Sequence, residues 1–186
     1  MKHAQFSLLF FLGLMICASP TGMKDFSDLD QNLPILLGHR SLITHSVFFP
    51  LVVYFFIERK KNRENVNLLI FLSGLFLGMG IHLVADLFPG RWGSNSFIKI
   101  PGNISIGYFS LPWIAFNAII SIYFAHRIIK KIPFKYLHEK TFIAISLFIG
   151  FFYSLNERNN QLFIFVTFLI LFISIFILKK KRPNYF

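Results

Sequence analysis

The sequence predicts an all-α protein, a polytopic bundle of about six transmembrane helices. Three observations support this fold class: the composition, six long apolar runs, and the position of the basic residues between those runs. Of the 186 residues, 55% are hydrophobic and 26 are Phe, and the mean hydropathy is +0.61. This composition is more apolar than that of an average soluble domain. We expect a single membrane domain over residues 1–186, without a separate soluble domain.

The six runs are long enough, or nearly so, to cross a bilayer, which requires about 20 apolar residues in helical form. They cover residues 4–19, 42–57, 66–88, 106–129, 140–155 and 161–178. The first run also fits a secretory signal peptide, because Lys2 precedes its apolar core and Ala18-Ser19-Pro20 follows that core. A retained helix gives six spans and a cleaved signal gives five, and both alternatives stay open.

The formal charge of +11 would suit a nucleic-acid-binding protein, but the basic residues lie in short clusters between the apolar runs. We interpret them as a topology signal and expect no nucleic-acid partner, since Lys and Arg concentrate in cytoplasmic loops. The basic clusters at 59–63, 127–135 and 179–182 alternate with poorer loops. Both termini are therefore expected in the cytoplasm. The segments 20–41, 89–105 and 156–160 are expected on the outer side.

Two smaller features complete this outline. Cys17 is the only cysteine, so the chain can form no internal disulfide, and we interpret this residue as a packing residue in the first run. The Pro- and Gly-rich stretch 89–107 is expected to be a loop that folds back onto the bundle. The site-bearing part is expected in residues 4–105, and residues 106–178 are expected to be apolar packing helices.

Side chains capable of chemistry gather at the expected outer surface. His82 and Asp86 lie four residues apart near the end of the third run, so a helix places both on one face. The other members of this set lie before or at the start of the second run: Asp28, Asp30, His39, Arg40 and His45. An ionisable group within a span costs about 2.5–3.5 kcal/mol and usually has a partner or a function. Imidazole and carboxylate groups at one depth predict a divalent metal site, of zinc, iron or manganese type.

Simpler interpretations of the same residues remain open. Asp28 and Asp30 are also compatible with solvated loop residues or helix caps, and His82 with Asp86 is compatible with a structural hydrogen-bonded pair. Thr44 and Ser46 flank His45, and we expect them to hold its second ring nitrogen or a carboxylate. Neither H-E-x-x-H, nor G-x-S-x-G, nor a P-loop occurs in the sequence.

The ordered motifs resemble a known family. They are Asp28-x-Asp30, His39-Arg40, Thr44-His45-Ser46 and His82-x-x-x-Asp86, followed by a loop rich in Pro, Trp and Gly. This order is similar to that of the YdjM-like membrane-bound metal-dependent hydrolases, small proteins of the bacterial inner membrane. The resemblance covers about residues 6–102, with Ser27 in place of the family's proline and one extra residue between Arg40 and Thr44.

The resemblance implies a metal-dependent hydrolase of the bacterial cytoplasmic membrane. The metal, most readily zinc, would be held by His39, His45, His82 and Asp86, with Asp28 or Asp30 as a bridging group or general base. Arg40 would hold an anionic group of the substrate, since its planar fork suits phosphate, and Arg91 and Lys99 would assist from the following loop.

A site at the outer surface, at headgroup depth, suggests a lipid or lipid-linked ester or phosphoester as substrate. The alternative is a non-enzymatic membrane protein, in which the His/Asp cluster is a structural lock or a binding site for a metal or a partner. A transporter is the weakest option, because residues 162–178 of the last run carry only Thr167 and Ser174 as polar residues. The sequence leaves the substrate, the metal and the oligomeric state open.

Overall fold

The fold is that of a computed structural model, which describes residues 3–19, 26, 40–59, 65–88, 97–101, 104–133 and 138–156. Within these residues the protein is mostly helical, as predicted. The α-helices are α1 (His3–Cys17), α2 (Phe48–Arg59), α3 (Val66–Asp86), α4 (Ser110–Lys131) and α5 (Glu139–Asn156). Two short antiparallel strands, β1 (Lys99–Ile100) and β2 (Ile104–Ser105), and the 3-10 turn η2 (Gly107–Phe109) precede α4.

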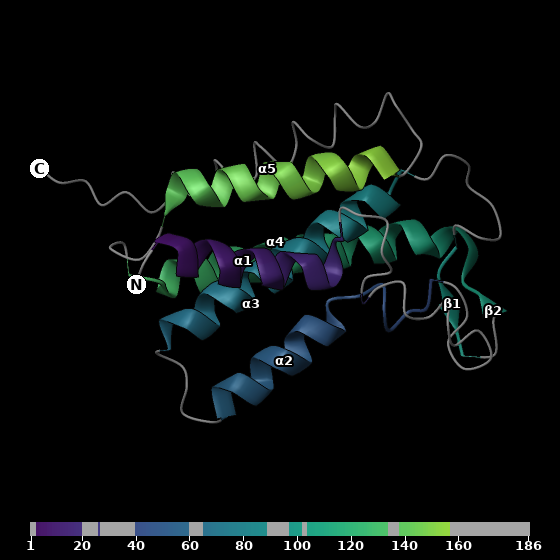
Figure 1. The fold of residues 1–186 in the computed structure, drawn as a ribbon. Helices are drawn as coiled ribbons and strands as arrows, with labels where there is room; N and C mark the ends of the chain where they lie inside the picture. The colour runs from purple at the N-terminus through teal and green to yellow at the C-terminus, as the bar shows by residue number, and fades with distance from the viewer. Residues whose placement is uncertain are drawn as a thin grey trace, which may run out of the picture.

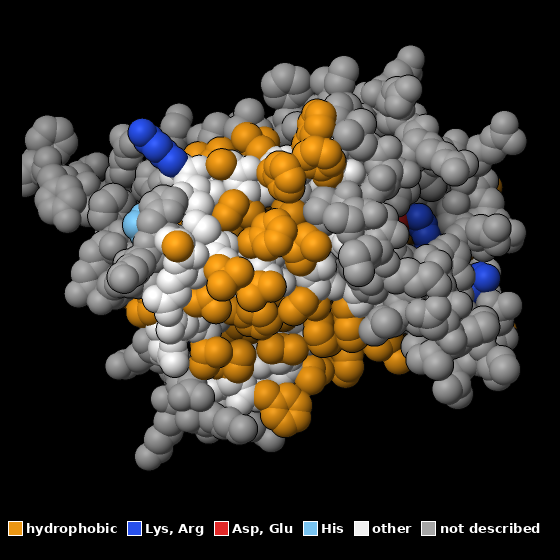
Figure 2. All heavy atoms as spheres, in the orientation of Figure 1, with side chains coloured by type: hydrophobic (Ala, Val, Ile, Leu, Met, Phe, Trp, Pro, Cys, Tyr) orange, Lys and Arg blue, Asp and Glu red, His pale blue; other side chains and the backbone are white. Residues whose placement is uncertain are grey.

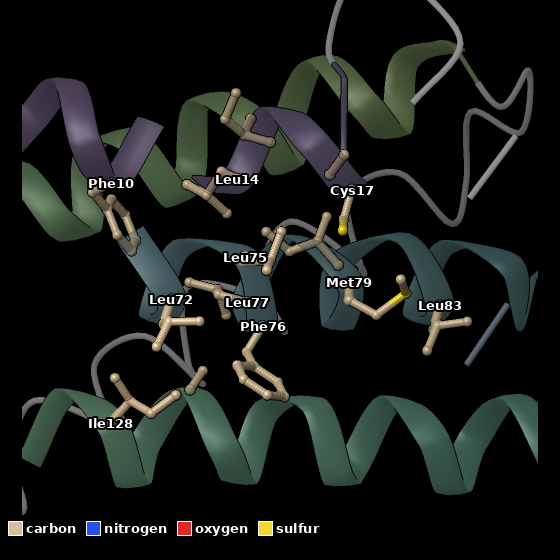
Figure 3. Packing of buried hydrophobic residues seen from close by; sticks show 14 of the residues in the cluster. Phe10, Leu14, Cys17, Leu72, Leu75, Phe76, Leu77, Met79, Leu83 and Ile128 are labelled. Carbon is tan, nitrogen blue, oxygen red and sulfur yellow. The ribbon is translucent and has the colours of Figure 1, made fainter. Parts of the chain in front are cut away.

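Helix α3 is the centre of the bundle. It packs against α1 on one side and α4 on the other, with α2 and α5 in further contact (Figure 1). Nearly all its residues from Leu69 to Asp86 are buried. In Figure 3, Phe10 and Leu14 of α1 lie toward α3, and Phe76 of α3 lies toward α4. The helix begins after Asn65, whose side chain accepts hydrogen bonds from the amides of Asn67 and Leu68 and so caps the first turn.

Helices α1 and α3 approach each other very closely through glycines. A Cβ atom placed on Gly13 would lie 2.2 Å from the carbonyl oxygen of Phe71, and one on Gly74 would lie 2.4 Å from that of Phe10. Gly74 and Gly78 form a G-x-x-x-G pair, which lets two helix backbones meet in membrane proteins. This packing makes α1 part of the core of the bundle.

The helices alternate in direction, so their termini gather at two ends. At the first end, Gln5 of α1 contacts Asn67 of α3, and Lys131 of α4 contacts Tyr54 of α2. We call it the basic end, because the Lys- and Arg-rich segments 59–63 and 127–135 begin or end there. At the opposite end, Ile98 donates a backbone hydrogen bond to the hydroxyl of Ser110 at the start of α4. We call this the hairpin end, since β1 and β2 lie there (Figure 1).

The helix lengths differ from those expected. Two helical segments of the described chain, Val66–Asp86 and Gly107–Lys131, are long and apolar enough to cross a membrane; the other apolar helices are shorter. The run 42–57 forms a helix only from Phe48, and 12 residues extend about 18 Å. The residues before it form a turn because the Ser and Thr hydroxyls bond to the local backbone instead. The expected span 161–178 lies outside the described residues.

The hairpin fulfils one expectation. Within the stretch 89–107, Lys99 pairs with the chain just before α2: its amide donates to the carbonyl of Arg40, and its carbonyl accepts from the amide of Leu42. The described part of this stretch, residues 97–101 and 104–107, therefore folds back onto the bundle beside the candidate site. These strands are the part of the fold that an all-α class does not include.

Candidate metal site

The last turn of α3 supplies two polar side chains to an apolar core. His82 and Asp86 are both buried and lie one helical turn apart, with Nε2 of His82 3.3 Å from Oδ2 of Asp86. Their spacing puts them on one face of α3, as predicted.

His45 reaches the same point from a different segment. It lies in the turn 41–47 that leads into α2, where its amide donates to the carbonyl of Ser41. Its Nε2 atom is 3.4 Å from Oδ2 of Asp86, and its ring meets that of His82 edge to face at a centroid distance of 5.2 Å. One carboxylate oxygen therefore faces two imidazole nitrogens that are 37 residues apart in the sequence.

The geometry of these three groups fits a metal ion. One donor atom from each of His45, His82 and Asp86 lies within 4.8 Å of the other two, and all three residues are buried. Two ligands bound to tetrahedral zinc at about 2.0–2.1 Å are roughly 3.3 Å apart. The two Nε2–Oδ2 distances of 3.3 and 3.4 Å match that separation. The group could thus hold a metal ion, and its nitrogen and oxygen donors suit zinc, iron or manganese.

A hydroxyl group orients the ring of His45. Thr44 Oγ1 lies 3.1 Å from Nδ1 of His45, and Thr44 is itself held by the hydroxyl of Ser41 at 3.0 Å. In the tautomer with the proton on Nδ1, the ring donates to Thr44 and keeps an Nε2 lone pair toward Asp86. An outer hydrogen bond of this kind is the usual way in which proteins fix a metal-binding histidine.

Arg40 forms an ion pair with the other carboxylate oxygen of Asp86. Its Nη2 atom is 2.7 Å from Oδ1, and both side chains are largely buried. Arg40 adopts a positive φ of 59° and is fixed by the backbone pairing with Lys99. The two oxygens of Asp86 thus differ: Oδ1 faces a guanidinium group, and the buried Oδ2 faces the Nε2 atoms of His45 and His82. An oxygen in this position is suited to a cation.

Ser46 does not contact the site as expected. Its hydroxyl donates to the carbonyl of Ile43 and accepts from the amide of Phe48, which places it at the start of α2. Asn117 of α4, which the sequence reasoning missed, steadies the same turn by accepting from the amide of Val47. The signal available was an amide side chain in an otherwise apolar stretch of the run 106–129.

The structure thus brings together four of the residues proposed from the sequence: Arg40, His45, His82 and Asp86. Asp28, Asp30 and His39 lie outside the described residues, as does Arg91. Lys99 contributes through its backbone.

Comparisons of the chain with protein-family models, with curated proteins and with solved structures give no match.

Proposed function

We propose that this protein is a metal-dependent hydrolase that works at one face of a bacterial cytoplasmic membrane. The observation that supports this most strongly is the buried His45–His82–Asp86 group at the hairpin end. Its donor types and spacings suit a divalent ion, most readily zinc. The motif order of the YdjM-like hydrolases agrees with this proposal.

The surface of the bundle supports a membrane environment. Large apolar side chains point outward on several helices, and apolar atoms dominate the described part of the face in Figure 2. These exposed residues include Leu8, Phe48, Phe55, Phe56, Phe116, Ile119 and Phe148. Extended apolar surface of this kind marks contact with a membrane or a partner. With the basic end in the cytoplasm, the candidate site lies toward the outer, periplasmic side, and the N-terminus lies in the cytoplasm.

The residues of the site divide the work as follows. His45, His82 and Asp86 would hold the ion. When bound, a divalent ion of this class acidifies a water molecule and polarises a carbonyl or phosphoryl oxygen. Arg40 balances the charge of Asp86 and positions its carboxylate. We assign His39 to the ligand set, and Asp28 or Asp30 to a bridging group or the general base, from the expected topology and the resemblance, since these residues lie outside the described part of the chain.

A lipid or lipid-linked ester or phosphoester is the proposed substrate. A pocket of about 370 Å³ opens beside the turn that carries His45, and its wall is almost entirely apolar. It is lined by Leu42, Ile43, Ser46, Val47, Phe48, Leu51, Trp113 and Asn117. Most ligand pockets are mainly apolar with a few polar groups near them. An acyl chain in this pocket would bring its ester group close to the turn 41–47.

The test is a hydrolysis screen of the full chain in detergent micelles. Phospholipids and acyl and phosphate esters of p-nitrophenol would be offered with Zn²⁺ or Mn²⁺. We expect turnover by the wild type and a loss of at least about 100-fold in Asp86→Asn. Ser73→Ala is the control, because it removes a buried polar group of the same helix. Absence of turnover by the metal-loaded wild type on every ester would overturn the hydrolase assignment.

A second function is favoured by one observation, the ion pair of Arg40 with Asp86. A carboxylate that is already neutralised and flanked by two imidazoles is also suited to a structural lock between α3 and the turn 41–47. A lock predicts that Asp86→Asn unfolds the protein and that the wild type binds no stoichiometric metal. The hydrolase predicts stoichiometric metal together with turnover.

A further inference from the structure

A second pocket lies at the basic end of the bundle. It has a volume of about 180 Å³ and is formed by α2 and α4. Its wall consists of Tyr54, Tyr123, Phe124, Arg127, Ile128 and Lys131. Asn117 of α4 contacts the turn that carries His45, so 10 to 14 residues of that helix separate this level from Arg127 and Lys131, roughly 15–21 Å.

Two cations flank this pocket, each against a tyrosine. Nζ of Lys131 lies 3.2 Å from the hydroxyl of Tyr54 and 5.5 Å from the centre of its ring. Nη1 of Arg127 lies 3.2 Å from the hydroxyl of Tyr123, and its guanidinium carbon is 5.8 Å from that ring. Both distances fall in the cation–π range, so the rings restrict where the two charges can lie.

One side of the pocket consists of aromatic rings that pack against one another. The ring of Tyr54 packs edge-on against Phe76 at 6.2 Å and Phe124 at 6.0 Å, and those two rings stack at 5.2 Å. Phe76 is a fully buried residue of α3. The tyrosine that contacts Lys131 is therefore packed against the core, which restricts where Lys131 can lie.

The polar groups of the pocket are suited to one kind of ligand. Both tyrosine oxygens accept hydrogen bonds from the cations, which places the two positive charges at the wall of the pocket. Guanidinium, ammonium and phenol groups together present donors, and no carboxylate is among the described residues of the wall. Phosphate oxygens are the matching acceptors, and a guanidinium group binds them in a bidentate manner.

We propose that this pocket binds a phosphate ester, and that the ester is the headgroup of an anionic phospholipid. Basic pockets between helices on the cytoplasmic side of a membrane recognise such headgroups. The half-buried ring of Phe124 beside the cations offers a surface for the start of an acyl chain. The site is independent of the metal centre.

The experiment measures lipid binding to the full chain in nanodiscs of phosphatidylcholine, with phosphatidylglycerol as the probe lipid. The test variant is Arg127→Gln/Lys131→Gln. The matched control is Lys130→Gln/Lys140→Gln, which removes two charges from exposed side chains that do not line the pocket. All four side chains are exposed, so we expect both variants to fold. Size-exclusion elution and thermal unfolding verify this.

We expect the test variant to bind phosphatidylglycerol roughly 10- to 30-fold more weakly than the wild type, from about 1 kcal/mol per basic residue. The control should lose clearly less affinity than the test variant, because neither of its side chains lines the pocket. Tyr54→Phe, which keeps the ring but removes the hydroxyl, should also weaken binding. Equal losses in the two double variants, or no loss in either, would overturn the proposal.

A second arm identifies the source of the phosphate. Soluble glycerol phosphate is added as a competitor of the nanodisc lipid. Displacement only at concentrations far above those of the lipid supports a membrane headgroup as the ligand. Displacement at equal concentration supports a soluble phosphate ester at the same site and overturns the assignment to a lipid.

Discussion

At the scale of single residues, Asp86 explains how the candidate site is organised. The spacing of His82 and Asp86 predicted their shared face, and Thr44 was expected to hold the second nitrogen of His45, as it does. The pairing of Arg40 with Asp86 was not predictable, because it joins segments 46 residues apart whose contact depends on the hairpin. Sequence reasoning had assigned Arg40 to a substrate anion.

The Arg40–Asp86 pair predicts a strong effect of removing one partner. Arg40→Met leaves the buried carboxylate without its counter-charge, so we expect the free energy of unfolding of the metal-free protein to fall by about 3–5 kcal/mol. Adding Asp86→Asn to this variant should restore part of that loss, since no buried charge then remains. Urea unfolding in detergent measures the free energy of unfolding of the single and the double variant. Additive losses in the double variant would contradict a direct pair.

Thr44 predicts a smaller and more specific effect. Thr44→Val keeps the shape of the side chain but removes the hydroxyl that meets Nδ1 of His45. We expect zinc affinity to fall roughly 10- to 100-fold while stability changes little, because the ring loses its orientation. Competition with a zinc chelator measures the affinity. Thr141→Val on α5 is the control, and an equal effect there would show that Thr44 has no special role.

At the scale of secondary-structure elements, the contact of α1 with α3 defines the bundle. The helices themselves were predictable from apolar runs, and four of them begin and end close to the expected residues. The start of α2 was misplaced, because hydropathy counts Leu42 and Ile43 as helical and ignores the hydroxyls around them. The close helix contact could have been predicted from the G-x-x-x-G spacing of Gly74 and Gly78.

The glycine contact predicts a difference between two similar substitutions. Gly74→Ala forces a Cβ atom against the backbone of α1, whereas Gly80→Ala meets the side chain of Ile122 at 2.9 Å, which can move. Both variants replace a helical glycine by alanine, so the gain in helix propensity is the same and cancels when their stabilities are compared. We expect Gly74→Ala to be less stable than Gly80→Ala by about 1–3 kcal/mol in thermal or urea unfolding. Equal stability of the two variants would mean that the backbones of α1 and α3 lie further apart than described.

At the scale of the whole molecule, the two ends of the bundle have different chemistry. The hairpin end holds the His/Asp group, and the basic end holds the phosphate pocket that we propose. The alternation of basic and poorer loops along the sequence predicted that successive helix ends gather at two opposite ends of the bundle. This separation of the ends depends only on the order of the apolar runs. The exact approach of His45 to His82 could not be predicted, since it depends on how the turn 41–47 packs against α3, α4 and the hairpin.

This division predicts a sidedness in the membrane. Cys17 is the single native cysteine, so Cys17→Ala gives a background for labelling. We expect Tyr108→Cys, at the exposed hairpin end, to react with an impermeant maleimide from the outer side, and Lys130→Cys to react only after the cytoplasmic side is opened. Labelling of both residues from the same side would contradict the proposed topology.

The measurement that tests the central claim most directly is the zinc content of the purified chain after chelation, reloading and removal of excess metal. The account predicts about one zinc ion per chain for the wild type and for Ser73→Ala, and none for His45→Ala or His82→Ala in folded, monodisperse samples. A wild type that retains no zinc, or histidine variants that retain a full equivalent, would contradict the assignment of His45, His82 and Asp86 as metal ligands.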